Sequence, residues 1–517
     1  MPALGRFFGS LFGRPHQQTF DTDEVYPLHF LDNLATGRVI VLSETLRFDA
    51  VLDATKLHDG LTRLLQQGDW RKLGGRLHMQ RNGTLEIHVP RQFTRERPAV
   101  RFTNNVLGVA IEDHALGRQF PQPTDGPSLQ TGPMSFAPFN AVPSGPATLH
   151  DYLCGDEAIL GLHVTSFNNA TLVALVWPHA VAGALGVKEL FAAWSKALRD
   201  GADDIPPLLG ARRDVLDELK ADADQKEASY ALGPRQIKGW NFVKFLVRLL
   251  WTVFTRPVVE SRAVFLPRQF VAQLQQNALQ ELEAVHDGGN SGNSSSSSSR
   301  KGLFLSEGDV LTAWASRFVA AARGGKRPGL IFNPLDIRSR LRIPWQAAGG
   351  GGGVYVQNLA GAMYTSVDAD MLVKRPLGEL AYAVRQSIQQ QATDEQIRAQ
   401  LRLFRALGHA KAEPLYGDAN AQLIAFSNWT KFDLFGAVDF SAAVVAATGS
   451  AAAGGTPPGR PVYMHCVSLG ENRFQRDCFA ITGKDLDGNY WITAFLYPED
   501  WQGLEDYIKQ TWKRIGT

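Results

Sequence analysis

His179 is the residue whose neighbours in the sequence are best suited to chemistry. It follows Pro178 at the end of a long apolar run, and the residues after it are small: Ala180, Ala182, Gly183 and Ala184. Small neighbours leave open space beside the imidazole, as a general base reached through a channel requires. From these neighbours alone, a structural histidine fits the position better than a base, so the rest of the chain must decide between them.

Other familiar catalytic patterns are missing from the sequence. Its 12 histidines include no HExxH pair, no His/Cys ligand spacing and no nearby carboxylate cluster at metal-binding intervals. Neither a GxSxG elbow nor a GxGxxG run after a strand occurs, which excludes the simplest hydrolase and dinucleotide-binding classes. The glycines at 349–353 lack the Gly-Lys-Ser/Thr of a phosphate loop. We therefore expect no bound metal or resident cofactor.

Length and composition predict an ordinary globular protein of two domains. The chain of 517 residues exceeds the ~250 to 300 residues that one hydrophobic core usually fills. Lys and Arg number 53 and Asp and Glu 51, and this balance argues against a nucleic-acid partner. The three cysteines, Cys154, Cys466 and Cys478, are widely spaced, which favours a reducing, cytoplasmic compartment over a disulfide framework.

Hydrophobic periodicity predicts the elements that surround His179. Residues 161–178 are typical of two β-strands joined by an Asn-Asn-Ala turn, and residues 186–198 have helical spacing. Upstream, strands are expected at 37–48 and 85–89 and a helix at 53–66. His179 would thus lie between a strand and a helix of an N-terminal domain spanning 1–205.

A second domain is predicted over 261–517, after a crossover at 206–260. Its expected elements are a strand at 263–266, a helix at 267–284, a helix at 307–323 capped by Ser306, a strand at 329–334 and a short extended segment at 336–341. The tract at 288–299 contains six consecutive serines and is expected to be a flexible surface loop.

The crossover contains a predicted amphipathic helix from Trp240 to Phe254. Lys244 and Arg248 lie four residues apart and share one face, and they interrupt the apolar run before the ~18 residues that a membrane span needs. We favour a helix that packs on its own protein, and weak attachment to a membrane surface is the alternative.

Six segments together carry a resemblance to a known family. They are YPLHFLD at 26–32, SFNNATLVALVWPHAVAG at 166–183, LSEGDVLTAWASRF at 305–318, LDIRSRL at 335–341, YVQN at 355–358 and SNWTKFDLFGAVDF at 427–440. In this order they resemble the opening strand, the hairpin before the HxxxD histidine, the helix that opens the second domain, the Arg-Ser-Arg strand, the Tyr-x-Gly-Asn segment and the DFGWG region of the BAHD acyltransferases. The likeness is to the divergent form found in fungal secondary metabolism.

The resemblance implies an α/β fold of two similar chloramphenicol-acetyltransferase-like domains, each a mixed β-sheet with flanking helices, with a channel between them. Acyl-CoA would enter as co-substrate from one side and a hydrophobic hydroxylated acceptor from the other. His179 would be the general base at the middle, and hydrogen-bond donors would stabilise the oxyanion. His29 and Asp32 would line the acceptor side. The matching segments also place Trp177, Tyr355, Asn358, Ser427 and Trp429 at the substrates. Members of the family are generally monomers, so a monomer is expected.

The sequence departs from the family pattern at three motifs. Gly183 stands where HxxxD has its aspartate, which the resemblance implies would pair with Arg338 or its neighbour. Asp336 and Asp439 are the candidates to replace it, because an unpaired buried guanidinium costs several kcal/mol. DFGWG is replaced by DFSAA at 439–443, and Gln357 replaces the glycine of Tyr-x-Gly-Asn.

Three functions remain open at this point. The favoured one is a CoA-dependent O-acyltransferase acting on a hydroxylated terpenoid or polyketide. The second is a cyclase, pericyclase or isomerase that holds a reactive intermediate in the interdomain cavity, which the loss of the motif residues favours. The third is a non-catalytic binding protein whose helix at 240–254 would be the interacting surface.

Overall fold

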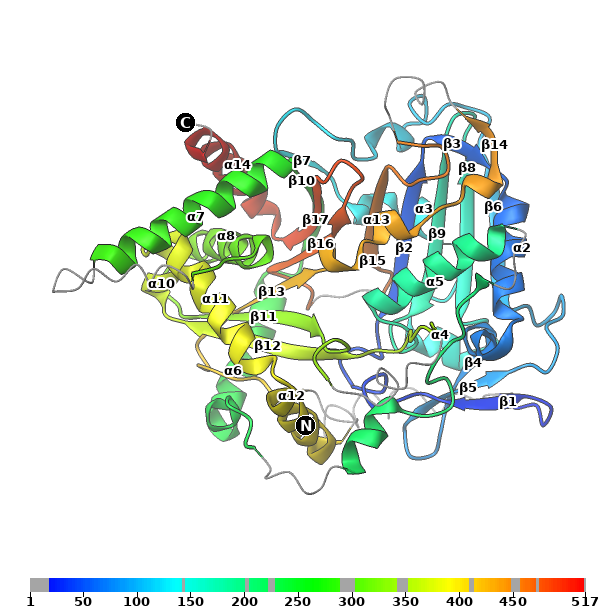
Figure 1. Cartoon of the computed structure of the whole chain (residues 1–517), viewed down its shortest axis with the longest axis horizontal. Coiled ribbons are helices and arrows are strands. Elements are labelled where there is room, and N and C mark those ends of the chain that lie inside the picture. Colours follow the sequence, from blue (N-terminus) through cyan, green and yellow to red (C-terminus); the bar gives the residue numbers. More distant parts are fainter. Residues whose placement is uncertain are drawn as a thin grey trace.

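The computed structural model describes residues 18–141, 145–199, 204–221, 228–288, 303–341, 352–408, 413–447, 456–470 and 474–515 (Figure 1). Two large β-sheets lie side by side, each covered by helices, which confirms the predicted α/β architecture. Of the predicted loops, the serine-rich tract from 289 onward and glycines 349 to 351 lie outside these residues.

The first sheet carries the strand that leads to His179. Its strands in spatial order are β15 (Tyr463–Ser468), β2 (Val41–Phe48), β9 (Thr171–Pro178), β8 (Leu160–Ser166) and β6 (Val100–Val106). All neighbours are antiparallel except β6 and β8, which are parallel. Every residue of β9 is buried, as its unbroken apolar run predicts.

The second sheet forms the core of the other half. Its strands in spatial order are β12 (Ala360–Val367), β11 (Gly329–Asp336), β13 (Gln422–Asn428), β16 (Cys478–Lys484), β17 (Tyr490–Leu496), β10 (Glu260–Leu266) and β7 (Ser128–Thr131). Smaller units are the sheet β1 (Glu24–Pro27), β5 (Leu85–Val89) and β4 (Arg76–Met79), and the ribbon β14 (Val444–Ala447) with β3 (Ala50–Leu52).

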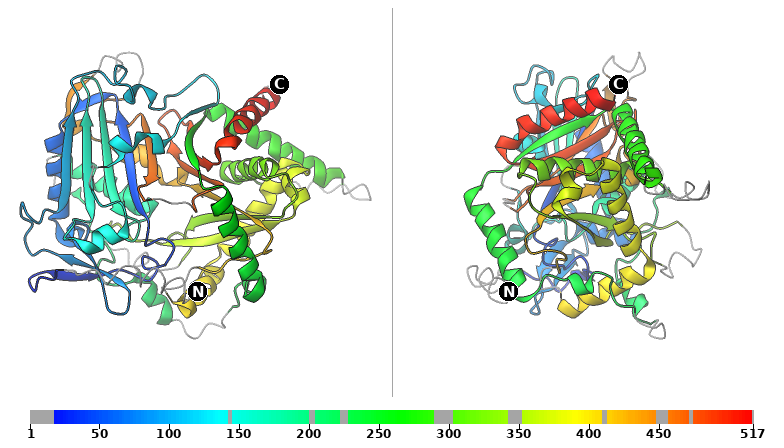
Figure 2. Two further views of the ribbon diagram at one scale, coloured as in Figure 1. Left: turned by 180° about the vertical axis from the view of Figure 1, so that it is seen from behind. Right: turned by 90° about the vertical axis from the view of Figure 1, so that its left-hand side faces the viewer.

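Helices cover both sheets. Beside the first sheet, α2 (Ala54–Leu65) packs on α5 (Ala184–Leu198), and the short α3 (Ala137–Asn140), α4 (Leu149–Cys154) and α13 (Leu434–Ala437) lie nearby. Against the second lie α7 (Arg268–Gly288), α8 (Glu307–Ala322), α10 (Ala369–Val373), α11 (Leu377–Gln391) and α14 (Trp501–Ile515). The helices α6 (Gly239–Thr255) and α12 (Asp394–Leu407) lie at one end (Figures 1 and 2). No described helix combines the length and apolarity needed to cross a membrane.

The two halves exchange strands. β15 comes from the C-terminal half but pairs with β2 in the first sheet, and β7 comes from the N-terminal half but pairs with β10 in the second. Each of the domains predicted at 1–205 and 261–517 therefore completes its sheet with a strand of the other. The halves are held together by backbone hydrogen bonds as well as by side-chain contacts.

Most local predictions are confirmed, and one segment is different. Ser306 caps α8 through a reciprocal capping box with Asp309. The predicted extended segment at 336–341 is wrong, because β11 ends at Asp336 and the chain turns. The cause is local: the Asp336 carboxylate accepts a hydrogen bond from the Arg338 backbone N–H at 3.0 Å, which closes a turn. The first long strand begins at Val41, four residues later than expected.

A buried glutamate makes the first sheet sensitive to pH. Glu44 lies in the middle of β2, fully buried and opposite Cys466 of β15, and burial raises its pKa to about 8. An unfolded chain holds this carboxyl at its ordinary pKa of 4.5. Between these two values the folded protein keeps a proton that the unfolded chain releases, so stability falls as pH rises.

We expect Glu44→Gln to remove that part of the pH dependence. The free energy of unfolding of the unmodified protein, relative to the variant, should fall by up to about 1.4 kcal/mol per pH unit between 4.5 and 8. Urea unfolding of both proteins at five pH values measures this difference, in which the shared titrating groups cancel. Parallel pH dependences of the two proteins would contradict the assignment.

Candidate active site

His179 lies in the connection between β9 and α5. Its backbone N–H donates to the Ile40 carbonyl at 2.8 Å, which ties it to the segment before β2. Trp177, at the end of β9, is buried and its indole N–H donates to the Ala182 carbonyl at 3.1 Å. The loop is thus closed on itself by Trp177, and the imidazole is left partly exposed.

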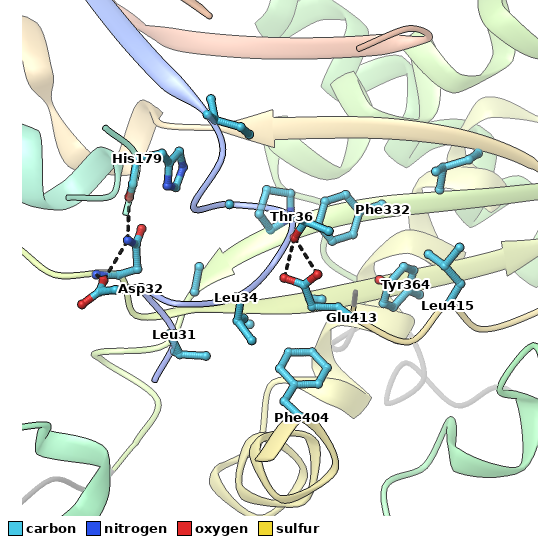
Figure 3. Close-up of a pocket in the computed structure, with 18 residues that line it drawn as sticks. Leu31, Asp32, Leu34, Thr36, His179, Phe332, Tyr364, Phe404, Glu413 and Leu415 are labelled. Carbon is cyan, nitrogen blue, oxygen red and sulfur yellow. Dashed lines mark hydrogen bonds between the residues drawn. The ribbon is translucent and has the colours of Figure 1, made fainter. Parts of the chain in front are cut away.

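The His179 side chain reaches a cavity of about 460 Å³. Figure 3 shows most of the wall as apolar side chains from the segment before β2, from β11 and β12, from α12 and from the segment before β13. They are Leu31, Leu34, Phe332, Tyr364, Phe404 and Leu415. Within this wall the Thr36 hydroxyl donates to the Glu413 carboxylate at 2.6 Å. Size and lining match a pocket for a small apolar molecule with a few polar groups.

One side chain links the two halves at His179. The Asn358 side-chain amide donates to the His179 carbonyl at 2.8 Å and to the Asp32 carboxylate at 2.9 Å (Figure 3). The same carboxylate accepts the backbone N–H groups of Asn358 and His29 at 2.9 and 3.1 Å. Asp32 is therefore committed to holding Asn358, which in turn holds the histidine loop.

The glycine at 183 is a condition of this arrangement. A Cβ at Gly183 would lie 2.8 Å from the Asn358 Oδ1 atom. The Asn358 amide fills the space beside the start of α5. A side chain at position 183 would enter that same space. The Asn358 amide is held by Asp32, which comes from the opening segment of the chain.

Arg338 is satisfied without an aspartate at 183. Its guanidinium pairs with Asp336 and donates to the carbonyls of Tyr355 and Gln357, at 3.3 and 2.6 Å respectively. Of the two candidates for this pairing, Asp336 makes the contact and Asp439 does not. Asp439 instead pairs with Arg199 and Arg460, the latter at 3.5 Å.

Burial sets the protonation of the site. It lowers the pKa of His179 below the ordinary 6.5, so the imidazole is neutral at neutral pH and able to accept a proton. Burial also raises the pKa of Asp32. The positive charge of Lys72 and the hydrogen bonds that Asn358 and His29 donate to Asp32 oppose that rise. Lys72 is itself buried and donates to the Ala211 carbonyl at 3.0 Å.

Several residues predicted at the substrates do not line this cavity. His29 and Tyr355 are buried and contact each other, with the imidazole Nδ1 and the phenol oxygen 2.8 Å apart. The Trp429 indole donates to the Ser427 hydroxyl at 2.9 Å at the end of β13. None of these four, nor Trp177, lines the cavity, whereas Asp32, Asn358 and His179 do.

Three polar residues near the site escaped sequence analysis. Thr36 and Glu413 meet across 377 positions of the chain, and no local spacing indicates such a pair. Lys72 follows a helix in an unremarkable polar stretch, although it lies buried near Asp32. Among the residues that the structure describes, no group of three His, Cys, Asp or Glu side chains could hold a metal ion.

The protein is therefore of the α/β class and has two lobes. A neutral histidine lies beside an apolar cavity in it. No model of a known protein family matches the sequence. It is 50% identical to the acetyltransferase pyiB of Pyricularia grisea over 99% of both chains. It is 34% identical to the acetyltransferase BOT5 of Botryotinia fuckeliana, over 93% of this chain and 90% of that one. A relative at 30% identity, calD of Penicillium decumbens, is named a transcriptional regulator and covers 95% of this chain and 96% of its own.

Solved structures share the fold. TRI101 of F. graminearum, complexed with coenzyme A and T-2 mycotoxin, superposes with a TM-score of 0.62 at 15% identity, over 93% of this chain and 97% of that one. Vinorine synthase gives 0.54 at 13% identity, over 94% of both chains. The chain belongs to the family of the fungal acetyltransferases pyiB and BOT5, and it has the fold of TRI101 and vinorine synthase.

We expect Gly183→Ala to strain the link to His179. Asn358 cannot move away from the new methyl group without losing its hydrogen bonds to Asp32 and His179, so the free energy of unfolding should fall by about 1 to 3 kcal/mol. In an Asn358→Ala background the same change should cost at least about 1 kcal/mol less. Urea unfolding of the four proteins in the cycle measures this coupling.

A control for this cycle is Gly233→Ala, since a Cβ there meets no atom within 4 Å. It should cost the same in both backgrounds. Additive effects of Gly183→Ala and Asn358→Ala would show that the two positions do not share the contact.

Proposed function

We propose that this acyltransferase transfers the acyl group of an acyl-CoA to a hydroxyl of a hydrophobic secondary metabolite, a terpenoid or a polyketide, with His179 as general base. The observation that carries the proposal is the position of His179, whose imidazole borders an apolar cavity and is kept neutral by burial. A neutral imidazole with access to a bound molecule is the form that accepts a proton.

The reaction follows from this geometry. The imidazole of His179 takes the proton of the acceptor hydroxyl as its oxygen attacks the thioester carbonyl carbon. The tetrahedral intermediate then collapses, the carbon–sulfur bond breaks, and the leaving CoA thiolate recovers the proton from the imidazolium. Asn358 does not touch the substrates in this scheme. Its hydrogen bond to the His179 carbonyl fixes the loop, so it is a positioning residue.

The cavity wall favours an acceptor that is mostly apolar. Leu31, Phe332 and Phe404 would pack on a carbon skeleton, while Thr36 and Glu413 form a polar pair in the same wall. A second hydroxyl of the acceptor would find its hydrogen-bond partner there. An oxygenated terpenoid or polyketide combines both features, and the solved relative TRI101 was crystallised with coenzyme A and T-2 mycotoxin.

Relatives named as acetyltransferases favour acyl transfer over the cyclase and the binding-protein alternatives, since the pyiB likeness spans the full chain at 50% identity. Two relatives named as transcriptional regulators are more distant than pyiB, at 30% identity each. The net charge of +2 gives no support to nucleic-acid binding.

We expect His179→Ala to lower kcat by about 100-fold or more for CoA release in the presence of a hydroxylated acceptor, because proton removal is the step that it serves. Binding of acetyl-CoA, measured by calorimetry, should persist. His58→Ala is the matched control, since this histidine is on α2 next to Asp59 and away from the cavity. Undiminished turnover of the His179 variant would exclude its role as base.

The acid limb of the pH profile of kcat/KM should lie below pH 6.5. Burial lowers the pKa of His179, so the imidazole stays neutral, and the base active, at pH values where an exposed histidine is protonated. Steady-state rates between pH 5 and 8 measure the limb, over a range where the protein is shown to be folded. A limb above pH 6.5 would be inconsistent with His179 as the base, because its pKa is lowered.

A further inference from the structure

The outer face of α6 is an apolar stripe. Of the 17 residues of this helix, all of them described, only Phe245 is buried. The exposed apolar residues follow one another at helical spacing: Trp240, Val243, Val247, Leu250, Trp251 and Phe254. Trp240, Trp251 and Phe254 are 69%, 64% and 80% exposed, so three large aromatic side chains lie in water. The expectation that this helix packs on its own protein holds for one face only.

The helix is firmly attached to the protein along its inner face. The Arg248 guanidinium donates to the Ala419 carbonyl at 2.7 Å, and Arg476 donates to the Thr252 and Arg256 carbonyls at 3.2 and 3.1 Å. Figure 2 shows α6 at the surface of the molecule, in front in the left view. The apolar stripe, defined by the six exposed residues above, is thus presented outward by a fixed element.

The charged residues in the segment that contains α6 are all positive. Between residues 228 and 259 the sequence contains no Asp or Glu, but it contains Arg235, Lys238, Lys244, Arg248 and Arg256. Lys238 and Lys244 are exposed, and Lys244 shares the outer face with Trp240 and Val247. Arg256 pairs with Glu499 at 3.3 Å, which leaves the cations nearer the helix start without a carboxylate in the same segment.

We propose that α6 docks this protein on the surface of an anionic membrane. A helix with an apolar face bearing tryptophan and phenylalanine, bordered by lysine, lies in the interface of a bilayer with its apolar side chains among the acyl chains. Lysine side chains reach the headgroups while their stems stay in the apolar layer. The cations complement phosphate and carboxylate headgroups, and this charge complementarity selects a lipid surface over a neutral apolar partner.

Docking would bring the cavity close to the lipid. The Ile237 N–H, just before α6, donates to the Leu415 carbonyl at 2.8 Å, and Gln236 forms a β-bridge with Tyr416. Leu415 and Glu413 both line the cavity beside His179. One wall of the cavity is therefore continuous with the docking helix. A route for an apolar acceptor from the membrane into the cavity rests on the proposed function. Docking of α6 on the membrane does not rest on it.

The test is co-sedimentation of the full-length protein with phosphatidylcholine vesicles that contain 0 or 30 mole percent phosphatidylserine, an order-of-magnitude choice for an anionic leaflet. We expect binding to the anionic vesicles that weakens as salt is raised. Trp251→Ser with Phe254→Ser should reduce the partition coefficient by about tenfold or more. Lys238→Gln with Lys244→Gln should reduce it by about fivefold per charge on anionic vesicles only.

The matched control replaces two exposed apolar residues outside α6, Val106→Ser in β6 with Val445→Ser in β14, which are 70% and 67% exposed. It should bind as the unmodified protein does. Sedimentation velocity without lipid should give a monomer for all four proteins. A dimer that only the Trp251/Phe254 variant abolishes would overturn the proposal in favour of a second copy on the stripe.

Absence of binding to either vesicle would also overturn the proposal, as expected if residues 1 to 17 or another partner cover the stripe. Activity with a water-soluble acceptor separates this proposal from the proposed function. That activity should be the same in the docking variants, whereas it should fall by about 100-fold or more in His179→Ala whether or not the protein binds vesicles.

Discussion

The hydrogen bond from Asn358 to the His179 carbonyl is the interaction on which the rest of the site depends. A single amide joins the histidine loop of one half to the chain that precedes β12 in the other, and the buried carboxylate of Asp32 orients it. Both hydrogens of the amide are donated, one to Asp32 and one to the His179 carbonyl, so the orientation of the Asn358 side chain is fixed. The position of His179 is therefore set by contacts between the halves, and not by the loop alone.

Strand exchange explains why the hydrogen bond between Asn358 and His179 can keep a fixed geometry. Each large sheet is completed by a strand of the other half, β15 in one and β7 in the other. The two halves cannot rotate against each other without breaking backbone hydrogen bonds in a sheet. A single side chain between them, Asn358, can then hold fixed distances, as the proposed proton transfer requires of a preorganised site.

Burial has three separate effects in this molecule. At His179 it keeps the imidazole neutral, at Glu44 it opposes ionisation in the middle of a sheet, and around the cavity it provides an apolar wall. The outer face of α6 is the exception, since aromatic side chains that would normally be covered are presented to solvent. An exposed apolar stripe on a fixed helix indicates an interaction site, and the proposed partner is a lipid surface.

The sequence by itself determined the local elements, the α/β class and the family, because apolar periodicity, capping residues and motif order are properties of neighbouring residues. It also singled out His179, and it offered Asp336 as a partner for Arg338, which the turn after β11 makes possible. Only the tertiary structure decided that Asp32 holds Asn358, that Gly183 makes room for that amide, and that Thr36 meets Glu413. These contacts join residues hundreds of positions apart, and no local pattern encodes a distance that is set by how two sheets pack.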